Sequence, residues 1–476
     1  MTNRLSALIA ACLAAGLAGA ARAQQTPQPQ PPTAAPQPAA TQQPSTPPPR
    51  GITLSEALLL ARQVNPTQVQ AEQNVRIANM GVMQAWGAYL PSISGTGSAA
   101  RNSPQRVNAS SGAAQVFPIT DNSSFGLSAT LNLFTGFQRG ANMRAANATM
   151  NLNEAALLQQ DYATDLATKQ AFFNEREAEE LVLVSQANLA QAEQQLKLTT
   201  EKLRLGATTR ADSLTASVAY GTAEVQLIQA RANALTAQAT LARAIGADGM
   251  VAAVPDTTLE VRLSSLDTAA LRQDAEATAP SVVQAQASVT AAQALLSASR
   301  SQYYPTLSLT GSQTWAGEQL PWNAAPLSPI TDSTGTIIGY NRGTRYTGTW
   351  NVRLSLSVPI FNGFQREASV VTADANAVTA RAKLRDARLG LDASLIQALT
   401  ALDAAAAQID VSRTSVASAQ ESLRMQQERY RLGASTIVDL LTAETALNQA
   451  EVGLVQSRYN YLIARATLEA LVGHTL

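Results

Sequence analysis

The residue types that most often catalyse reactions or bind metals are nearly absent from this sequence. It contains one cysteine, Cys12, and one histidine, His474, in 476 residues. A zinc cluster, a disulfide, a Cys–His dyad and a Ser–His–Asp triad each need more of these residues than the chain offers. Carboxylates remain available for acid–base catalysis, but no motif groups them into a catalytic pair. We therefore expect no enzymatic activity, no cofactor and no metal site.

The composition indicates long helices rather than a thick globular core. The chain has 34 basic and 34 acidic residues, so its formal net charge is zero and no bulk field favours nucleic acid as a partner. Only 14% of residues are charged and 5% are aromatic. Alanine is abundant; it buries little area but has the highest helix propensity.

The N-terminal segment reads as an export signal followed by a tether. Arg4 precedes an apolar run over residues 5–17, and the small residues Ala21 and Ala23 suit a cleavage site, which predicts a signal peptide over residues 1–23. An alternative is lipidation at Cys12, within Ile9-Ala10-Ala11-Cys12. Residues 24–50 are rich in Pro, Gln and Thr and predict a disordered linker. We expect no transmembrane helix after the signal.

The rest of the chain is duplicated. Residues 133–139 (LFTGFQR) recur as residues 360–366 (IFNGFQR), a shift of 227, and the same shift takes Gly206 to Gly433. Further upstream the shift is 214, which takes Pro66 to Pro280. The two shifts differ in a Gly-, Ser- and Asn-rich segment between residues 98 and 125, which predicts a loop there. Two repeats, 52–249 and 266–476, with a connector over 250–265, follow from this pattern.

Each repeat contains two segments with the alternation of β-strands. Residues 92–98 and 306–312 alternate hydroxyl side chains with apolar residues or Gly, and residues 125–133 and 352–360 alternate apolar with mainly polar residues. Two hairpins leave open edges and cannot form a stable soluble sheet by themselves. An outer-membrane barrel built from several chains removes both problems, with apolar side chains facing lipid. Aromatic residues near one end of these strands could form an interfacial girdle; they are Trp86, Tyr89, Phe134, Phe137, Tyr303, Tyr304, Phe361 and Phe364.

The segment over residues 139–205 contains no Pro and almost no Gly, which predicts one uninterrupted helix. At ~1.5 Å per residue this helix would be roughly 100 Å long. Such a helix needs lateral partners along its length. Apolar residues recur every seven positions beside a second seam of small residues, as in a coiled coil with close helix approach. The apolar seam is Val182, Leu189, Leu196 and Leu203, with Ile409, Val416, Leu423 and Tyr430 one repeat later; the small seam is Ser185, Ala192, Ser412 and Ala419.

Both long helices are expected to break at a glycine, Gly206 or Gly433, and to return as a second helix over residues 212–245 or 439–472.

The segment 430–441 (YRLGASTIVDLL), the closing 459–463 (YNYLI) and the opening 54–58 (LSEAL) resemble signature segments of the TolC outer-membrane efflux family. The resemblance covers essentially everything after the linker.

This resemblance implies an α+β membrane protein: a homotrimer in which each chain gives four strands to a twelve-stranded outer-membrane β-barrel. Below the barrel, a periplasmic α-helical coiled-coil barrel would extend to a tip that meets a periplasmic adaptor protein and, through it, an inner-membrane transporter. The protein would be the passive exit duct of a tripartite efflux pump or type I secretion system in the Gram-negative outer membrane. The residues matching the adaptor-contact tip are Leu205, Gly206, Leu432 and Gly433.

The resemblance also implies a periplasmic gate at Asp439, Asp212 and Tyr430. Three symmetry-related copies of Asp439 would form a carboxylate ring, in which mutual repulsion raises pKa values and attracts cations. A solvated or helix N-terminal carboxylate is the alternative interpretation of Asp439. The sequence departs from the family pattern at Thr442, where a second acidic ring is expected, and at Ser435, where an Arg is expected. Both departures suggest a looser closed state.

A second class of function fits the same coiled-coil pattern, namely a non-transporting trimeric surface or structural protein. That hypothesis places the helical stalk outside the cell, whereas the duct places it in the periplasm. The cargo is not indicated by the sequence, because in such systems the transporter selects it.

Overall fold

The computed structural model describes residues 50–102, 105–107, 114–116, 120–254, 268–319, 329–331, 333–334, 337–340 and 345–475. The expected signal peptide (1–23), Cys12 and all but the last residue of the expected linker (24–50) lie outside the described residues. The same holds for most of the expected connector and for parts of the two strand-to-strand loops.

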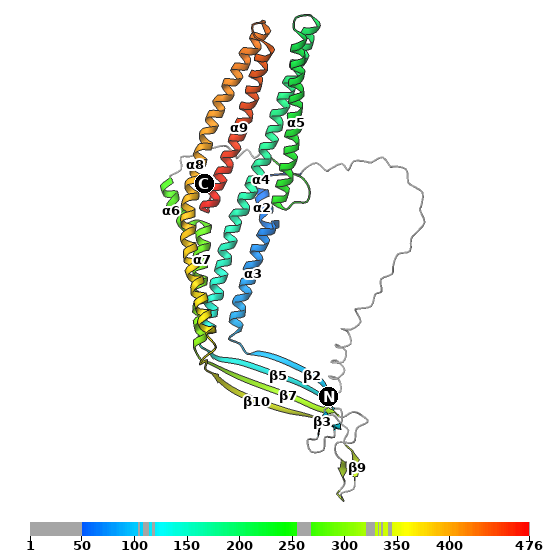
Figure 1. Ribbon diagram of the computed structural model, residues 1–476, viewed down its shortest axis with the longest axis vertical. Helices are drawn as coiled ribbons and strands as arrows, with labels where there is room; N and C mark the ends of the chain where they lie inside the picture. The colour runs from blue at the N-terminus through cyan, green and yellow to red at the C-terminus, as the bar shows by residue number, and fades with distance from the viewer. Residues whose placement is uncertain are drawn as a thin grey trace, which may run out of the picture. The chain divides into compact units, whose positions relative to one another are not determined.

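Two long helical hairpins dominate the described part of the chain. Helix α4 (Gln138–Arg204) returns as α5 (Arg210–Ile245), and α8 (Gln365–Arg431) returns as α9 (Ile437–Val472). The members of each pair pack along each other, with the turns at the top of Figure 1. Helices α4 and α8 both have 67 residues, and α5 and α9 both have 36. Every boundary of the first hairpin recurs 227 residues later in the second, at the offset that the sequence predicts.

Shorter helices continue the rows that α5 and α9 begin. They are α2 (Leu54–Val64), α3 (Pro66–Gly87), α6 (Thr268–Thr278) and α7 (Pro280–Arg300), the last followed by the 3-10 turn η1 (Ser301–Tyr303). Asn65 Nδ2 donates to the carbonyl of Ala244 (3.2 Å) near the end of α5, and Thr278 Oγ1 donates to that of Val472 (2.8 Å) at the end of α9. Carbonyls that a helix end leaves without an intrahelical partner are thus satisfied by the segment before the next helix.

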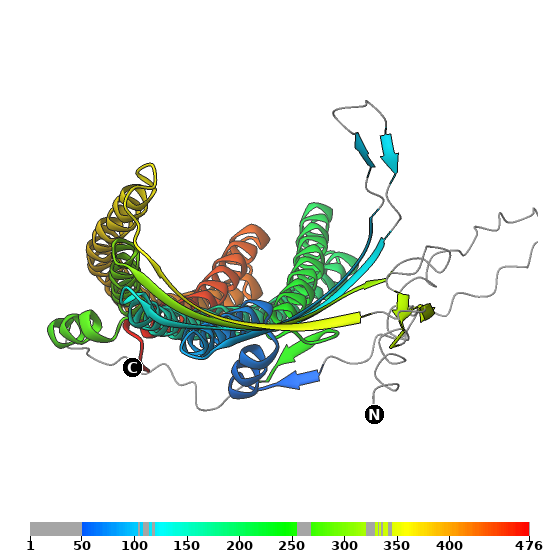
Figure 2. The same ribbon diagram turned by 90° about the horizontal axis from the view of Figure 1, so that it is seen from below.

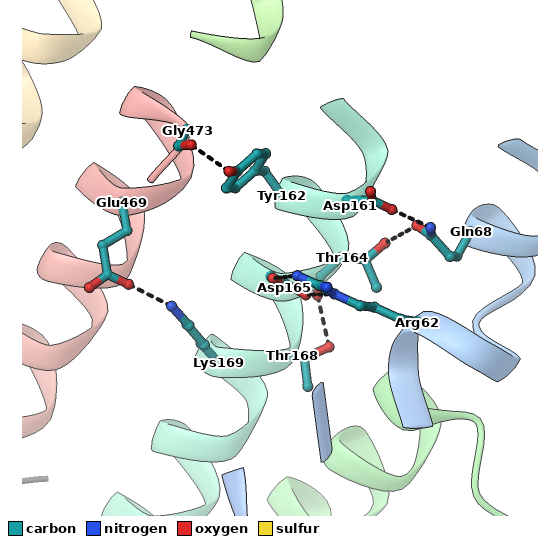
Figure 3. A network of polar contacts seen from close by, with 10 residues as sticks. All are labelled: Arg62, Gln68, Asp161, Tyr162, Thr164, Asp165, Thr168, Lys169, Glu469 and Gly473. Carbon is teal, nitrogen blue, oxygen red and sulfur yellow. Dashed lines mark hydrogen bonds and ion pairs between the residues drawn. The ribbon is translucent and has the colours of Figure 1, made fainter. Parts of the chain in front are cut away.

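Polar contacts join α4 to the helices on both of its sides at this level (Figure 3). Arg62 of α2 makes a bidentate ion pair with Asp165 (2.9 and 2.5 Å), and Lys169 pairs with Glu469 of α9 at 2.5 Å. The main core surrounds the same region, with Phe172, Leu241, Leu395, Ile409 and Leu468 all essentially inaccessible to solvent. Within the described residues, the largest core therefore lies in the middle of the long helices.

A four-stranded antiparallel sheet lies at the end of the long helices opposite their turns (Figure 1). Its strands are β2 (Ser92–Asn102), β5 (Thr120–Thr135), β7 (Thr306–Gln319) and β10 (Arg345–Ser357), in the order β10-β7-β5-β2. The sheet is visibly curved in Figure 2. Because β2 and β10 are edge strands, each exposes one side of its backbone hydrogen-bonding groups.

Three smaller strand pairs accompany this sheet. Strands β3 (Gln105–Val107) and β4 (Ala114–Val116) pair with each other, as do β8 (Pro329–Thr331) and β9 (Ile337–Tyr340). The first of these pairs falls in the segment between residues 98 and 125 that the sequence predicts as a loop. The third pair is parallel, with β1 (Arg50–Ile52) beside β6 (Val251–Ala253), so Arg50 and the first residues of the expected connector belong to strands.

The strands also differ from the sequence prediction at their ends. Strands β2 and β7 run past the expected residues 98 and 312, whereas β10 stops at Ser357, so Val358 and Ile360 lie beyond the strand that was expected to include them. In β5 the pairing shifts between Asn132 and Phe134, so Leu133 sits at a bulge. Alternation alone cannot locate such an irregularity, because it inserts a residue without changing the pattern of residue types.

The backbone is unusual at the two corners where a strand leads into a long helix, from β5 into α4 and from β10 into α8. Phe137 and Phe364 each have φ of 64°, and each stands at the N-cap of a 67-residue helix. This left-handed conformation is rare for a bulky side chain. Phe137 packs edge-to-face on Phe134 and Tyr304, with centroid distances of 5.3 and 5.5 Å, and Phe364 packs likewise on Phe361 at 5.4 Å. The expected aromatic cluster therefore lies where strands turn into helices.

One described helix, α8, is long and apolar enough to cross a membrane by length and composition alone, and 22% of that window is buried within the single chain. This differs from the expectation of no transmembrane helix after the signal, because the middle of α8 is rich in alanine and leucine. Helix α8 packs along α7 and α9 as one member of the helical array.

Candidate functional site

The two turns between the long helices are built the same way. We call residues 205–209 and 432–436 the tip turns. In the first, the N–H groups of Gly206 and Ala207 bond the carbonyls of Leu203 (3.0 Å) and Lys202 (2.8 Å), and in the second Gly433 and Ala434 bond Tyr430 (3.2 Å) and Arg429 (2.8 Å). This bonding pattern is the Schellman motif, which ends a helix with a left-handed residue. The φ angles of Gly206 and Gly433, +74° and +72°, explain why glycine occupies both positions.

Each tip turn presents a leucine to solvent. Leu205 and Leu432 are 73% and 72% exposed, and no atom lies within 4 Å of where a Cβ would stand on either glycine. Each tip is therefore a small, open apolar surface on a fixed backbone. An exposed apolar group at a rigid turn is suited to contact with another protein.

The next residues form two capping boxes, one at the start of each returning helix, and each box holds one of the predicted gate carboxylates. Asp212 Oδ2 accepts hydrogen bonds from the Thr209 N–H (3.1 Å), the Thr209 hydroxyl (2.7 Å) and the Thr208 hydroxyl (2.8 Å). Asp439 Oδ2 accepts from the N–H and hydroxyl of Thr436 at 2.9 and 2.8 Å. Both carboxylates therefore begin a returning helix, where negative charge is favourable.

These hydrogen bonds affect the charge of both carboxylates. The Thr209 hydroxyl, followed by that of Thr208, lowers the pKa of Asp212 below its ordinary value. The backbone N–H of Thr436, followed by its hydroxyl, does the same for the pKa of Asp439. In a trimer, the expected ring of Asp439 copies raises their pKa values by mutual repulsion, whereas within one chain the capping bonds lower the pKa.

Tyr430, the third predicted gate residue, joins the two hairpins through its ring. The Lys202 ammonium of α4 lies 4.1 Å from the centroid of the Tyr430 ring in α8, a cation–π contact. The ring also packs on a small core formed by Leu423, Ile437, Leu440 and Ala443. The Tyr430 hydroxyl is buried and has no hydrogen-bond partner among the described residues. Tyr430 is thus not bonded to Asp212 or Asp439 in this conformation.

The two positions that depart from the family pattern make only local bonds. The Thr442 hydroxyl donates to the carbonyl of Val438 (2.8 Å) in its own helix, and the Ser435 hydroxyl reaches the carbonyl of Gln426 at 3.5 Å. Among the described residues, neither side chain is bonded to the other hairpin. The capping threonines and Lys202 are the site residues that the sequence analysis did not name. The Thr-x-x-Asp pattern at 209–212 and 436–439 marks the capping boxes, whereas the Lys202–Tyr430 contact has no local signal.

At the opposite end, the register of the large sheet separates its side chains into two faces. Residues directly opposite each other share a face. We call one the hydroxyl face; its rows are Ser92, Thr130, Thr310 and Arg353, then Ser94, Ser128, Ser312 and Asn351. The other is the apolar face, with rows Leu131, Leu309 and Leu354, then Ile93, Ala129, Gly311 and Val352. Gln313 is a polar exception on the apolar face.

Neither face is covered by other parts of the described chain. On the apolar face Ile93, Val352 and Leu354 are 75%, 62% and 62% exposed. On the hydroxyl face, Ser94 and Ser128 bond each other at 2.8 Å, as do Ser98 and Ser124. A sheet with one exposed apolar face and two open edges is incomplete as a single chain in water.

Helix α5 also has an apolar stripe that no other part of the described chain covers. Leu214, Val218, Val225, Ile228 and Leu235 are all more than half exposed and recur at helical spacing. Such a stripe normally packs on another helix.

No group of three or more His, Cys, Asp and Glu side chains that could hold a metal ion occurs within the described ranges.

Comparison with known proteins gives one consistent similarity. The family model described as "Outer membrane efflux protein" matches residues 57–247 and 271–474, most of the chain. The chain is 27% identical to the outer membrane protein TolC of Escherichia coli over 337 residues, which cover 68% of this chain and 65% of TolC, just under two thirds of its length. It is 24% identical to the outer membrane efflux protein BepC of Brucella suis over 87% of this chain and 84% of BepC.

The fold is likewise found among solved structures. The outer membrane channel CmeC of Campylobacter jejuni superposes with a TM-score of 0.70 at 19% identity, and the alignment covers 94% of each chain. At this identity the similarity concerns the fold, a sheet at one end of long helical hairpins.

Proposed function

The chain belongs to the outer membrane efflux protein family, and we propose that it is a passive exit duct: three copies form one channel from the periplasm to the exterior. The duct would carry substrates delivered by an inner-membrane transporter and a periplasmic adaptor, as part of a tripartite efflux pump or a type I secretion system. It would perform no chemistry on its cargo.

The observation that carries this proposal is the two-faced sheet. Its apolar face suits the hydrocarbon core of the outer membrane, and its hydroxyl face suits a water-filled lumen. Because backbone groups cannot remain unpaired in lipid, the edges β2 and β10 must pair with other strands. Pairing β10 of one copy with β2 of the next closes a barrel, and three copies of four strands give twelve.

The positions of aromatic residues support a membrane boundary at each end of the strands. Tyr304 lies at the helical end, and Trp315 stacks on Phe125 at the other end with a centroid distance of 5.7 Å. The interval from residue 304 to 315 is about 36 Å along an extended chain at ~3.3 Å per residue. At a tilt of ~40° it spans about 28 Å of the membrane normal, close to the ~25 Å apolar band of outer-membrane barrels.

The helical part suits a tunnel wall in the periplasm. In a trimer, the exposed stripe of α5 would pack on a neighbouring chain. The matching lengths and boundaries of α4 with α8 and of α5 with α9 support an internal two-fold repeat, so that three chains would form a wall with approximate six-fold regularity.

We assign the tip turns to contact with the adaptor, through Leu205, Gly206, Leu432 and Gly433. The gate would lie beside them, with Asp439 and Asp212 supplying negative charge and Tyr430 joining the hairpins. The local bonding of Thr442 and Ser435 supports a closed state with few cross-links between helices, in keeping with a looser latch.

Protease treatment of intact cells distinguishes this proposal from a trimeric surface stalk. The duct exposes only strand-to-strand segments that lie within residues 99–124 and 313–347, so cleavage should be confined to these ranges until the outer membrane is permeabilised. Cleavage of α4 or α8 in intact cells would place the helices outside and support the surface protein instead.

A further inference from the structure

A cavity lies among the helices at the junction where α9 ends and α7 begins. Its volume is about 500 Å³, and α4, α8, α9 and the first residues of α7 surround it. Its lining includes Gln159, Ala163, Ser281, Ser394, Ala401 and Ala470. The volume lies within the ~300–1,000 Å³ range of pockets that bind small molecules.

The cavity has a structural cause in the junction between two helix ends. Helix α9 ends at its C-cap Gly473, and α7 begins at Pro280; a Cβ on Gly473 would come within 3.1 Å of the Pro280 Cδ. Tyr162 of α4 donates a hydrogen bond to the carbonyl of Gly473, which holds the junction against α4 (Figure 3). Two abutting helix ends leave more space beside them than a continuous helix does. Small residues such as Ala470 and Ser281 line this gap and do not fill it.

The lining carries no charge. It consists of alanine, leucine and proline together with neutral polar side chains, and none of its members is Asp, Glu, Lys, Arg or His. Charged groups nearby, Lys169 and Glu469, are paired with each other. The side-chain oxygen of Gln159 is buried without a hydrogen-bond partner, so the polar groups of this wall are not fully satisfied within the described chain.

This neutrality is specific to one half of the molecule. At the 227-residue offset, Gln159 corresponds to Asp386 and Ala470 corresponds to Arg243. The counterpart positions therefore carry one charge of each sign. The repeat does not by itself require an uncharged lining around the α9–α7 junction.

We propose that this cavity is a binding site for an uncharged, drug-sized organic molecule with both apolar and polar parts. Such a molecule can exchange water for the alanine-rich wall while its polar group meets the neutral hydroxyl and amide side chains. A charged analogue loses hydration without meeting an opposite charge, and this cost disfavours it. The site is separate from the tip and the barrel, and its occupancy does not depend on the export function.

A matched set of fluorescent probes tests this proposal on the purified full-length protein in lipid nanodiscs. The probes are 9-anthracenemethanol, which is uncharged, 9-anthracenecarboxylate, which is anionic, and 9-(aminomethyl)anthracene, which is cationic at neutral pH. The alcohol should bind saturably with one site per chain, and each charged probe should bind at least about tenfold more weakly.

Variants of the wall separate binding in the cavity from uptake by lipid. Ala401→Phe should weaken binding of the alcohol at least about tenfold by filling space, whereas Ala401→Ser should leave it unchanged. Ser394→Lys should shift the preference toward the carboxylate. Ala163→Phe, from the facing wall of α4, serves as a second filling variant if Ala401→Phe does not retain its helical circular dichroism.

Two results would overturn the proposal. One is equal uptake of the alcohol by the wild type and by a folded filling variant, which means partition into lipid only. The other is binding of either charged probe as tightly as the alcohol. Neither result bears on whether the protein is an export duct, because the measurement contains no transport step.

Discussion

Asp439 and Thr436 cap the returning helix of the second tip by holding each other through three hydrogen bonds. The Thr436 N–H and hydroxyl donate to Asp439 Oδ2 at 2.9 and 2.8 Å, and the Asp439 N–H donates back to the Thr436 hydroxyl at 3.2 Å. Asp439 therefore has a structural role within each chain in addition to the gate role that we propose for the trimer.

The two roles of Asp439 can be separated by mutation. Asp439→Asn should weaken block of the reconstituted channel by divalent cations about tenfold, because it removes the negative charge from the constriction. Thr436→Ala should lower helix stability by about 1 kcal/mol through loss of the cap but keep the charge and the block. Single-channel recording with added Mg²⁺ measures the block; an equal loss in both variants would mean that the cap alone matters.

Lys202 and Tyr430 should hold the two hairpins together at the tip. Replacing Lys202 with Met keeps the length of the side chain and removes the cation–π contact, so the ratio of open to closed channels should rise roughly fivefold, which corresponds to about 1 kcal/mol. Tyr430→Phe should leave this ratio unchanged, since the hydroxyl has no partner to lose. A large effect of Tyr430→Phe on conductance would instead indicate a hydroxyl bond made between chains.

The long helices and most other element positions could be predicted from the sequence, because each depends on a local or periodic signal. The glycines that end α4 and α8 and the alternation in β5 are such signals. The strand ends and the parallel pairing of β1 with β6 could not be predicted, since they depend on contacts between segments far apart in the chain. The left-handed Phe137 and Phe364 also lacked a signal, because glycine is the residue normally expected at positive φ.

An arginine should have opposite effects at two neighbouring positions of β10, because their side chains lie on opposite faces of the sheet. Val352→Arg places a charge on the apolar face near the middle of the strands, which should cost about 2–4 kcal/mol in the membrane and reduce the amount of trimer in the outer membrane. Asn351→Arg, on the hydroxyl face, should assemble normally. Heat-resistant trimer from outer-membrane fractions, resolved by gel electrophoresis, measures the difference, and equal assembly of both variants would argue against a lipid-facing apolar face.

Glu175 should make the helical body less stable as the pH rises. Its side chain is fully buried in the core, and burial, followed by the neighbouring Glu179, raises its pKa to about 8. The folded protein therefore keeps a proton that the unfolded chain loses above pH ~4.5. The stability linked to this proton is complete below pH ~4.5 and is lost as the pH rises through about 8.

Glu175→Gln mimics the protonated side chain and should remove this dependence. Its melting temperature, followed by circular dichroism, should match that of the wild type near pH 4.5 and exceed it increasingly toward pH 8. The difference in free energy of unfolding should grow by up to roughly 1 kcal/mol per pH unit. Glu154→Gln, at an exposed position of the same helix, is the matched control. A constant difference between Glu175→Gln and the wild type across this range would contradict the protonated state.

The positions of the tip turns could be predicted from the sequence, but the side-chain contacts around them could not. The Gly-centred turns and the position of Asp439 follow from motifs, but the orientation of the Tyr430 ring toward Lys202 results from the packing of one hairpin on the other. The burial of Glu175 could not be predicted either, because it is one of four glutamates within residues 175–180 and glutamate normally faces solvent.

Electrical recording of the purified wild-type protein in planar lipid bilayers tests the duct most directly. We predict discrete insertion events that each produce a small, cation-preferring conductance, because a closed tip with Asp439 and Asp212 limits the current. Absence of conductance after verified insertion, or a pore that prefers anions, would contradict the account.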